Sequence, residues 1–313
     1  MDSLTIFDTL RKNFDLSNKL LVVLGPSLSS KTSLGLILAR YLKTSIISTD
    51  SRQVYKHLDY STGKLKFGDS FNFKKGLGFW LIDDIYYWGY DIMEANYTFS
   101  AADFVNFVNN EVISNITSVP IIVGGTGLYI NALLGNLNLG YPKPNFKLRK
   151  KLEKKSILEL HQILKKLDFD LNILNNSDLH NKRRLIRKIE ILSHRPKGFI
   201  GPTVADKFSL LNYYKINPLY IRLERKSYKS FVQSWLDKNF ENIKKEVDWL
   251  LSNYPKSPLF EGFIFKEFKK HLTRNLPKIE VKNQITTSYL RYIKRQKTYF
   301  NKYFPQSNLF IVD

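Results

Sequence analysis

Short apolar runs alternate with amphipathic stretches along the first part of the chain. Residues 19–25 (KLLVVLG) form an almost continuous apolar run that ends in glycine, which is typical of a buried parallel strand. In residues 32–42 leucines recur every four positions, and this spacing predicts a helix packed on the sheet. Residues 45–48 (SIIS) return to strand character after a short turn. The pattern therefore predicts a strand–helix–strand unit.

The same alternation continues further along the chain. Residues 101–116 carry apolar side chains on one helical face, and residues 119–123 (VPIIV) form a third apolar run. Strands that alternate with helices predict a parallel α/β sheet. Much later, residues 218–223 (PLYIRL) return to strand character, so we expect the chain to rejoin the first sheet there. Residues 285–303 are predicted to form a C-terminal helix.

The middle of the chain differs from both of its flanks. The segment GYPKPNFK opens a strongly helical stretch at about residue 140, and RPKGFIGPT closes it near residue 200. Residues 147–197 contain 15 Lys/Arg and 6 Asp/Glu, a net charge of +9. We therefore expect a mainly helical, basic insertion over residues 141–199, and a core formed by residues 1–140 together with residues 200–313.

Composition places the chain among globular proteins and sets its charge apart. Of 313 residues, 43% are hydrophobic and 25% charged, which excludes a wholly disordered or fibrous chain. The net charge of +21 indicates a polyanionic partner, either nucleic acid or an anionic membrane surface. A generally lysine-rich composition is the alternative explanation for part of this excess.

Several classes of site are excluded by residue usage. The absence of cysteine excludes disulfides, thiolate zinc sites and a cysteine nucleophile, and the five histidines lie too far apart for a transition-metal site. The N-terminus is acidic where a signal peptide is basic, and no apolar run approaches the roughly 18 residues of a membrane span. We therefore expect no membrane segment and a cytoplasmic protein.

The turn after the first strand carries a phosphate-binding pattern. Residues 25–32 (GPSLSSKT) fit the P-loop G-x-x-x-x-G-K-S/T, except that Ser30 replaces the second glycine. Backbone N–H groups at the helix start would bind phosphate, Lys31 would reach the outer phosphate, and the Thr32 hydroxyl would bind Mg²⁺. The alternative is an ordinary strand–turn–helix junction. We favour phosphate binding, with the grip weakened by Ser30, through Gly25, Pro26, Ser27, Ser29, Ser30, Lys31 and Thr32.

Polar groups also follow the second and third strands. Asp50 lies at the carboxyl edge of the sheet beside the phosphate-binding turn, where open α/β sheets bind ligands. There a carboxylate is suited to hold Mg²⁺, to act as a general base or to cap the next turn, and the pattern does not choose among these. Residues 124–127 (GGTG) follow the third strand and add the hydroxyl of Thr126. Three such turns predict one shared site.

Five segments together resemble the tRNA dimethylallyltransferase (tRNA isopentenyltransferase) family. In chain order they are GPSLSSKT, IISTDSRQVYKHLDYSTGK, YTFSAADF, VPIIVGGTGLYINALL and YIKRQ, and they extend from about residue 20 to residue 300. The blocks D-S-x-Q-V-Y and P-I-I-V-G-G-T-G-L-Y are the most specific. The resemblance implies a P-loop NTPase-like parallel sheet flanked by helices. It also implies transfer of a dimethylallyl group from its diphosphate to N6 of an adenine next to the anticodon.

The resemblance further implies individual roles. Asp50 would take the proton from N6, Thr126 would position the diphosphate or the base, and Arg225 would join the phosphate-binding turn. The partners would be dimethylallyl diphosphate and the anticodon stem-loop of tRNA, with Mg²⁺ as cofactor, and we expect a monomer. The predicted tRNA contacts are Asp50, Ser51, Arg52, Gln53, Thr126, Arg149, Arg183, Arg184, Arg187, Lys294, Arg295 and Gln296.

Two basic helices would then meet the RNA. Residues 180–190 (HNKRRLIRKIE) resemble the family's R-x-x-R-A-L-E helix, with Arg184 and Arg187 on one face. The alternative is a solvated basic face, but an RNA substrate favours phosphate contacts. Near the C-terminus no acidic residue occurs between Val281 and Lys302, so this helix is also suited to RNA.

The chain departs from the family pattern in three places. Besides Ser30, residues 231–236 (FVQSWL) stand where the family has R-I-x-x-R-V, so two arginines are missing. Residues 66–89 are rich in aromatic side chains and lack the family's His-His pair. These losses keep a catalytically weakened tRNA-binding paralogue open as an alternative. A small-molecule P-loop kinase is the other, although a kinase has no need for the basic insertion.

Overall fold

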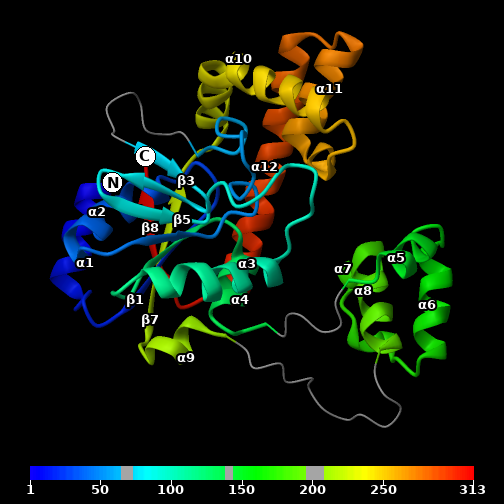
Figure 1. Cartoon of the computed structure of the whole chain (residues 1–313), viewed down its shortest axis with the longest axis horizontal. Coiled ribbons are helices and arrows are strands. Elements are labelled where there is room, and N and C mark those ends of the chain that lie inside the picture. Colours follow the sequence, from blue (N-terminus) through cyan, green and yellow to red (C-terminus); the bar gives the residue numbers. More distant parts are fainter. Residues whose placement is uncertain (65–72, 138–143, 195–207) are drawn as a thin grey trace. The chain divides into compact units, whose positions relative to one another are not determined.

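The computed structural model describes residues 1–64, 73–137, 144–194 and 208–313 (Figure 1). The chain divides into two compact units. The first comprises residues 1–137 together with 208–313, and the second comprises residues 138–207. That the second unit is a separate tRNA-binding domain stays a prediction.

The first unit is built on a mixed sheet, which has eight strands in the described part of the chain. Their order is β3-β4-β5-β2-β6-β1-β7-β8, and the strands from β5 to β8 pair in parallel. This confirms the predicted P-loop-like α/β class. The strands are β1 (Leu20–Leu24), β2 (Ile46–Ser48), β3 (Phe73–Gly76), β4 (Phe79–Ile82), β5 (Ile85–Trp88), β6 (Ile121–Gly124), β7 (Pro218–Arg225) and β8 (Asn308–Val312).

Each of the four predicted strands is present, and the described residues form four more that the sequence pattern does not predict. β3 and β4 form an antiparallel hairpin that continues into β5 at one edge of the sheet. β3 carries Lys74 and Lys75 and is almost wholly exposed, so it shows no apolar run from which a strand could be predicted. β8 adds a parallel edge strand beside β7 after the last helix.

Helices cover this sheet and lie beyond its carboxyl edge. The predicted helix over residues 101–116 is α-helical only in its first half, and it continues as a π-helical turn (Val108–Val112) and a 3₁₀ turn (Ile113–Asn115). The helices of the first unit are α1 (Ser3–Asn13), α2 (Lys31–Leu42), α3 (Ala101–Phe107), α4 (Gly127–Leu133), α9 (Leu210–Tyr214), α10 (Lys229–Asn253), α11 (Phe263–Arg274) and α12 (Lys278–Tyr303).

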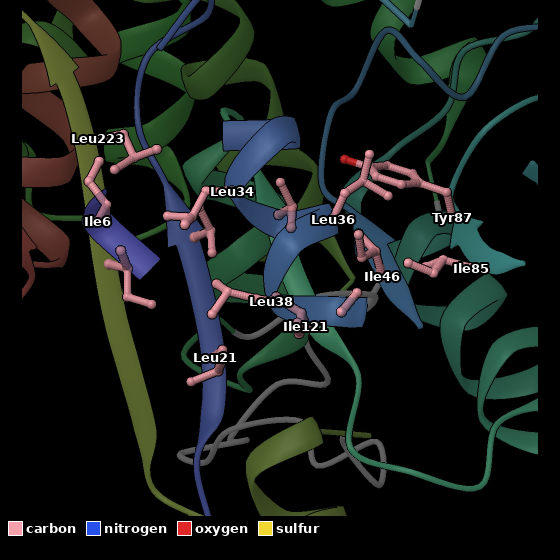
Figure 2. Close-up of a cluster of buried hydrophobic side chains, with 14 of the residues drawn as sticks. Ile6, Leu21, Leu34, Leu36, Leu38, Ile46, Ile85, Tyr87, Ile121 and Leu223 are labelled. Carbon is pink, nitrogen blue, oxygen red and sulfur yellow. The ribbon is translucent and has the colours of Figure 1, made fainter. Parts of the chain in front are cut away.

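The core of the first unit lies where α1 and α2 pack on one face of the sheet (Figure 2). Leu34 and Leu38 of α2 are fully buried in one cluster with Leu21 of β1 and Ile121 of β6. Removing one such leucine side chain typically costs about 2–5 kcal/mol of folding stability. This packing fixes α2 against the sheet, so its N-terminus lies at the carboxyl ends of β1 and β6.

The second unit is a small helical bundle with its own core. Its helices are α5 (Phe146–Leu152), α6 (Ile157–Lys166), α7 (Asn176–Leu179) and α8 (Lys182–Ser193). Their amphipathic faces bury Leu152, Leu160, Leu164, Leu185, Ile186 and Ile189. The side chain of Glu190 is fully buried beside this cluster, so it requires compensating charges.

Candidate active site

The turn between β1 and α2 has the backbone of an anion-binding loop. Gly25 has φ of +152°, and a Cβ atom there would lie 2.2 Å from the carbonyl oxygen of Leu223. Leu28 and Ser30 are left-handed, with φ of 65° and 62°. Turns that alternate left- and right-handed residues point successive N–H groups at a bound anion. The Nζ of Lys31 lies 2.6 Å from the carbonyl oxygen of Pro26, within the same loop.

Ser30 occupies the glycine position of the motif and uses its hydroxyl. Its Oγ accepts a hydrogen bond from Nη2 of Arg225 at 3.0 Å, and Nε of Arg225 donates to the carbonyl oxygen of Leu28 at 2.5 Å. The guanidinium also lies 3.6 Å from the ring centroid of Phe231, and burial lowers the pKa of Arg225. Arg225 therefore braces the loop, whereas its contact with diphosphate stays a prediction.

We expect Ser30→Gly to be more stable than Ser30→Ala by about 1 kcal/mol. Both variants lose the hydrogen bond to Arg225, but only glycine adopts φ of 62° without strain. Urea unfolding of the two variants measures the difference. Equal free energies of unfolding would contradict this explanation, because they would mean that the loop relaxes when the hydroxyl is removed.

The turns after β2 and β6 are tied together, as their predicted roles require. The Oγ1 of Thr126 accepts a hydrogen bond from the backbone N–H of Ser51 at 3.1 Å. The carboxylate of Asp50 accepts from the backbone N–H of Arg52 at 2.9 Å. Burial raises the pKa of Asp50, and the Arg52 hydrogen bond and the charge of Lys31 oppose this only in part. A carboxyl group with a raised pKa is suited to accept a proton.

Gln296 lies inside the site, where its side chain is hydrogen-bonded to the protein, and its predicted contact with tRNA stays a prediction. Its side chain is buried on α12, where Oε1 accepts from the N–H of Ser27 at 3.2 Å and Nε2 donates to the carbonyl oxygen of Gly125 at 2.9 Å. A Cβ atom at Gly125 would lie 2.7 Å from this Nε2. Gln296 therefore joins the phosphate-binding turn to the GGTG turn.

The side chain of Gln53 is likewise hydrogen-bonded within the protein. Its Oε1 accepts from the hydroxyl of Ser48 at 2.8 Å, and its Nε2 donates to the carbonyl oxygens of Thr62 and Gly63 at 3.3 and 3.4 Å. A buried amide satisfies its donors and acceptor within the protein, and the contact of this side chain with tRNA stays a prediction. Gln53 holds residues 61–63 beside the end of β2.

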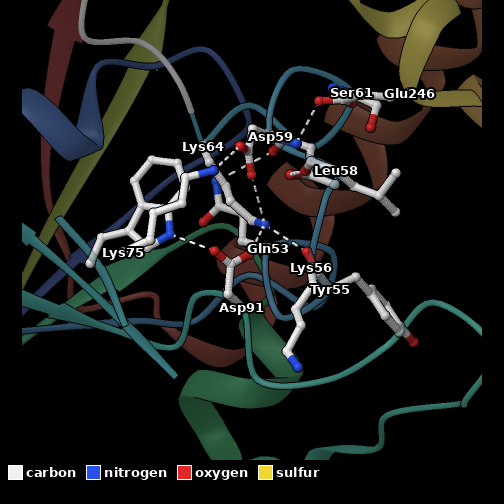
Figure 3. Close-up of polar contacts among 12 residues, drawn as sticks. Gln53, Tyr55, Lys56, Leu58, Asp59, Ser61, Lys64, Lys75, Asp91 and Glu246 are labelled. Atoms are coloured by element: carbon white, nitrogen blue, oxygen red, sulfur yellow. Dashed lines mark hydrogen bonds and ion pairs between the residues drawn. The ribbon is translucent and has the colours of Figure 1, made fainter. Parts of the chain in front are cut away.

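A buried polar network holds the neighbouring residues 59–64 (Figure 3). The ammonium group of Lys64 is fully buried and lies 2.6 Å from Asp91 and 3.2 Å from Asp59. Glu246 of α10 accepts hydrogen bonds from the backbone N–H groups of Asp59, Tyr60 and Ser61 at 2.7, 2.7 and 2.8 Å. Burial raises the pKa of Glu246. The sequence gives no signal for Glu246, which lies about 185 positions from the loop that it binds.

These elements enclose two adjoining cavities. The smaller one, which we call the phosphate cavity because the phosphate-binding turn lines it, has a volume of about 50 Å³, and the larger one, the outer cavity, has a volume of about 380 Å³. Asp50, Ser27, Thr62 and Tyr289 line both. The phosphate cavity is also lined by Lys31, Thr32, Gly124, Gly125, Tyr87 and Trp235, and the outer cavity by Ser51, Arg52, Phe263, Tyr292 and Arg295.

Other predicted tRNA contacts of the first unit lie at the outer cavity or on the surface of α12. Ser51, Arg52 and Arg295 line the outer cavity, and Arg295 lies 5.8 Å from the ring centroid of Tyr292. Lys294 is exposed on α12. The outer cavity therefore combines positive charge with aromatic rings, a combination typical of sites that bind an unstacked nucleobase.

In the second unit, two predicted RNA-binding arginines have structural partners. Arg149 binds the buried carboxylate of Glu190 at 2.7 Å, and Arg187 forms an ion pair with the same group. Burial alone would raise the pKa of Glu190, but the hydrogen bonds from these arginines outweigh it and lower the pKa to about 2. Arg183 and Arg184 are exposed, and Arg184 pairs with Asp178. Arg149 and Arg187 thus hold the bundle together, whatever else they contact.

Comparison with known proteins agrees with this geometry. A sequence model of the family described as IPP transferase matches residues 53–303. A tRNA dimethylallyltransferase of Alkaliphilus metalliredigens is 31% identical over 297 residues, covering 92% of this chain and 90% of that protein. One from Ligilactobacillus salivarius is 29% identical over 307 residues, covering 91% of each chain. The crystal structure of a tRNA isopentenylpyrophosphate transferase from Bacillus halodurans matches with a TM-score of 0.61 and 26% identity, covering 95% of this chain and 91% of that one.

Proposed function

The chain belongs to the IPP transferase family, and we propose that it transfers the dimethylallyl group of dimethylallyl diphosphate to N6 of an adenine next to the anticodon of tRNA. As a member of this family it is a transferase of prenyl groups onto tRNA. The observation that carries the proposal is the position of Asp50. Its side chain lines both the phosphate cavity and the outer cavity, where a donor and an acceptor would meet.

In this proposal the phosphate cavity binds the diphosphate, which is the leaving group. Lys31 and Thr32 at the start of α2 line this cavity, and helix N-termini and ammonium groups stabilise the negative charge that develops as the C–O bond breaks. Groups that are already oriented toward developing charge lower the barrier without reorganising during the reaction.

Asp50 acts as the general base. The N6 lone pair attacks C1 of the allyl group, the electrons of the C–O bond leave with the diphosphate, and the N6 proton passes to the carboxylate of Asp50. The raised pKa of Asp50 makes this carboxylate a better proton acceptor than an exposed one. Thr126 holds the backbone after Asp50 by accepting from the N–H of Ser51.

The oxygen donors at this cavity fit Mg²⁺. The hydroxyl of Thr32 and the carboxylate of Asp50 both line the phosphate cavity, and Mg²⁺ is commonly held by one or two side-chain oxygens together with substrate phosphates. When bound, the ion would neutralise part of the charge of the leaving diphosphate. Thr32 is the residue that we assign to it.

The outer cavity and the basic surfaces bind the tRNA in this proposal. The target adenine must leave its stack to reach Asp50, and Tyr292 and Phe263 offer rings against which an extruded base stacks. Arg52 and Arg295 supply charge for the neighbouring phosphates, and the exposed Arg183 and Arg184 of the second unit supply charge for other phosphates of the tRNA. Among the described residues, no helix is both long enough and apolar enough to cross a bilayer. A monomer and a cytoplasmic location stay predictions.

A labelling experiment tests the proposed function. The full chain is incubated with dimethylallyl diphosphate labelled in the allyl group and with unmodified tRNA, and in parallel with γ-labelled ATP and tRNA. We expect label in the tRNA in the first reaction only, and none when guanine replaces the target adenine. Phosphate transfer from ATP would favour a kinase, and tRNA binding without transfer would favour a non-catalytic paralogue.

Arg184 and Arg187, two of the three arginines of α8, are expected to respond differently to replacement by alanine. Arg184→Ala should leave the free energy of unfolding within about 1 kcal/mol, since its pair with Asp178 is exposed, but should lower the salt dependence of tRNA binding by about one unit of slope. Arg187→Ala removes a partner of the buried Glu190 and should cost about 1–3 kcal/mol. Urea unfolding and binding titrations at several salt concentrations measure both. The reverse assignment of the two effects would contradict this account.

A further inference from the structure

Two aromatic residues stand one helical turn apart at the start of α10, and the structure uses them differently. The ring of Phe231 stacks with the guanidinium of Arg225, which braces the phosphate-binding turn. Trp235 lines the phosphate cavity itself. The chain therefore presents an indole beside the diphosphate site at the position where the sequence pattern of the family places an arginine.

The indole packs against a buried tyrosine that lines the same cavity as the phosphate-binding turn. Tyr289 is buried, and it lines the phosphate cavity together with Ser27 of that turn. The rings of Tyr289 and Trp235 meet edge to face, with centroids 5.6 Å apart and an interplanar angle of 66°. Because Trp235 is only half buried, its remaining surface is available to a ligand in the cavity that it lines. The ring of Tyr289 thus holds the indole beside the phosphate-binding turn.

An indole in this place suits the transferred group better than the leaving group. Among the described residues that line the phosphate cavity, Lys31 is the one with a positively charged side chain. Trp235, Tyr87 and Val123 give the cavity apolar walls. Trp offers a large apolar surface for a five-carbon chain and a negative π-face for positive charge. Resting on the proposed function, we propose that Trp235 is the wall against which the allyl group packs and that its π-face stabilises the positive charge on that group.

The wall assists the transfer of the allyl group from the diphosphate to N6. As the bond between C1 and the diphosphate oxygen lengthens, its electrons go to the diphosphate and C1 and C3 of the allyl group share positive charge. The N6 lone pair then completes the new C–N bond, and the proton goes to Asp50. The same wall keeps water from the allyl group, which otherwise would yield the free alcohol.

Binding measurements test the wall without relying on turnover. The two probes are inorganic diphosphate and the unreactive thiolodiphosphate analogue of the donor, titrated with Mg²⁺ into the full-length wild type and into the Trp235→Leu and Trp235→Phe variants. We expect the wild type and Trp235→Phe to prefer the allyl-bearing analogue by about fivefold or more, and Trp235→Leu to lose most of that preference. Affinity for inorganic diphosphate should stay within threefold in all three proteins. Equal preference in Trp235→Leu would overturn the proposal even if no transfer were observed.

Turnover then tests the electronic part. In the labelling assay Trp235→Leu should lower kcat by about 10–30-fold, the size expected for a desolvated cation–π contact, and Trp235→Phe should stay within threefold. Trp249→Leu, on the same helix and outside both cavities, is the matched control and should be close to wild type. A loss as large in Trp235→Phe as in Trp235→Leu would overturn the π-face role in favour of the indole N–H. A Trp235→Arg variant as fast as wild type would also overturn it. Absence of transfer by the wild type would instead refute the proposed function, and the binding result would still decide the wall.

Discussion

Replacing Asp50 by asparagine is expected to lower the rate of prenyl transfer by about 10²–10⁴ while tRNA binding stays within a few-fold. Asparagine has nearly the same shape and still accepts the hydrogen bond from the N–H of Arg52, so the turn after β2 is preserved. What it lacks is a carboxylate that takes the N6 proton. Single-turnover kinetics measure the loss, and filter binding measures tRNA affinity.

The control for this prediction is Asp248→Asn, an exposed carboxylate on α10 that is expected to leave activity unchanged. Activity of Asp50→Asn within tenfold of wild type would contradict the role of Asp50 as the base.

The pH dependence of Asp50 follows from the direction of its pKa shift. Because burial raises the pKa in the folded protein, the carboxylate is lost on acidification at a higher pH than for an exposed aspartate, and the transfer rate should fall there. As the pH rises, Asp50 ionises at a lower pH in the unfolded chain than in the folded protein. Above the pKa of the unfolded chain, ionisation of Asp50 therefore destabilises the fold. Asp50→Asn should therefore raise Tm at pH 7. A lower Tm at pH 7 would show that the carboxylate stabilises the site.

Replacing Lys31 by alanine is expected to lower kcat/KM by about 10²–10³. Lys31 is the first residue of α2 and lines the phosphate cavity, with its Nζ 2.6 Å from the carbonyl oxygen of Pro26. The variant lacks the positive charge that stabilises the bound diphosphate and also the leaving group in the transition state. Calorimetric titration with diphosphate and Mg²⁺ should show a binding loss of at least tenfold, consistent with a charged hydrogen bond.

The exposed Lys43 at the other end of α2 provides the matched control for Lys31. Lys43→Ala should bind diphosphate as wild type does, and both variants should retain tRNA binding. If Lys31→Ala kept wild-type affinity for diphosphate, the turn after β1 would not be the diphosphate site.

The sequence predicts those parts of this molecule that depend on local pattern. Apolar runs identify the central parallel strands, and polar residues after them bring Lys31, Asp50 and Thr126 to one edge of the sheet. β3 escapes prediction because an exposed edge strand needs no apolar run. The register and neighbours of β8 depend on β7, which lies more than 80 positions earlier.

The same limit applies to the site. Gln53 and Gln296 carry side chains that could bind RNA, and only the fold shows that their donors and acceptors are used by Thr62, Gly63, Ser27 and Gly125. For Glu246 the sequence predicts no role at all. An acidic residue in a helix carries no signal, and its function is visible only once the fold places the loop of residues 59–61 against it. Local pattern places chemistry at strand ends, and long-range contacts decide which side chains remain available to a ligand.

The most direct measurement of the central claim is the nucleoside composition of the tRNA after reaction. Unmodified tRNA is incubated with the full chain, Mg²⁺ and dimethylallyl diphosphate, then digested to nucleosides and to oligonucleotides that are analysed by mass spectrometry. The account predicts one adenosine that is heavier by a dimethylallyl group on N6, located in the oligonucleotide next to the anticodon, and its absence with Asp50→Asn. Unmodified adenosine at that position, or the adduct on another atom or another nucleoside, would contradict it.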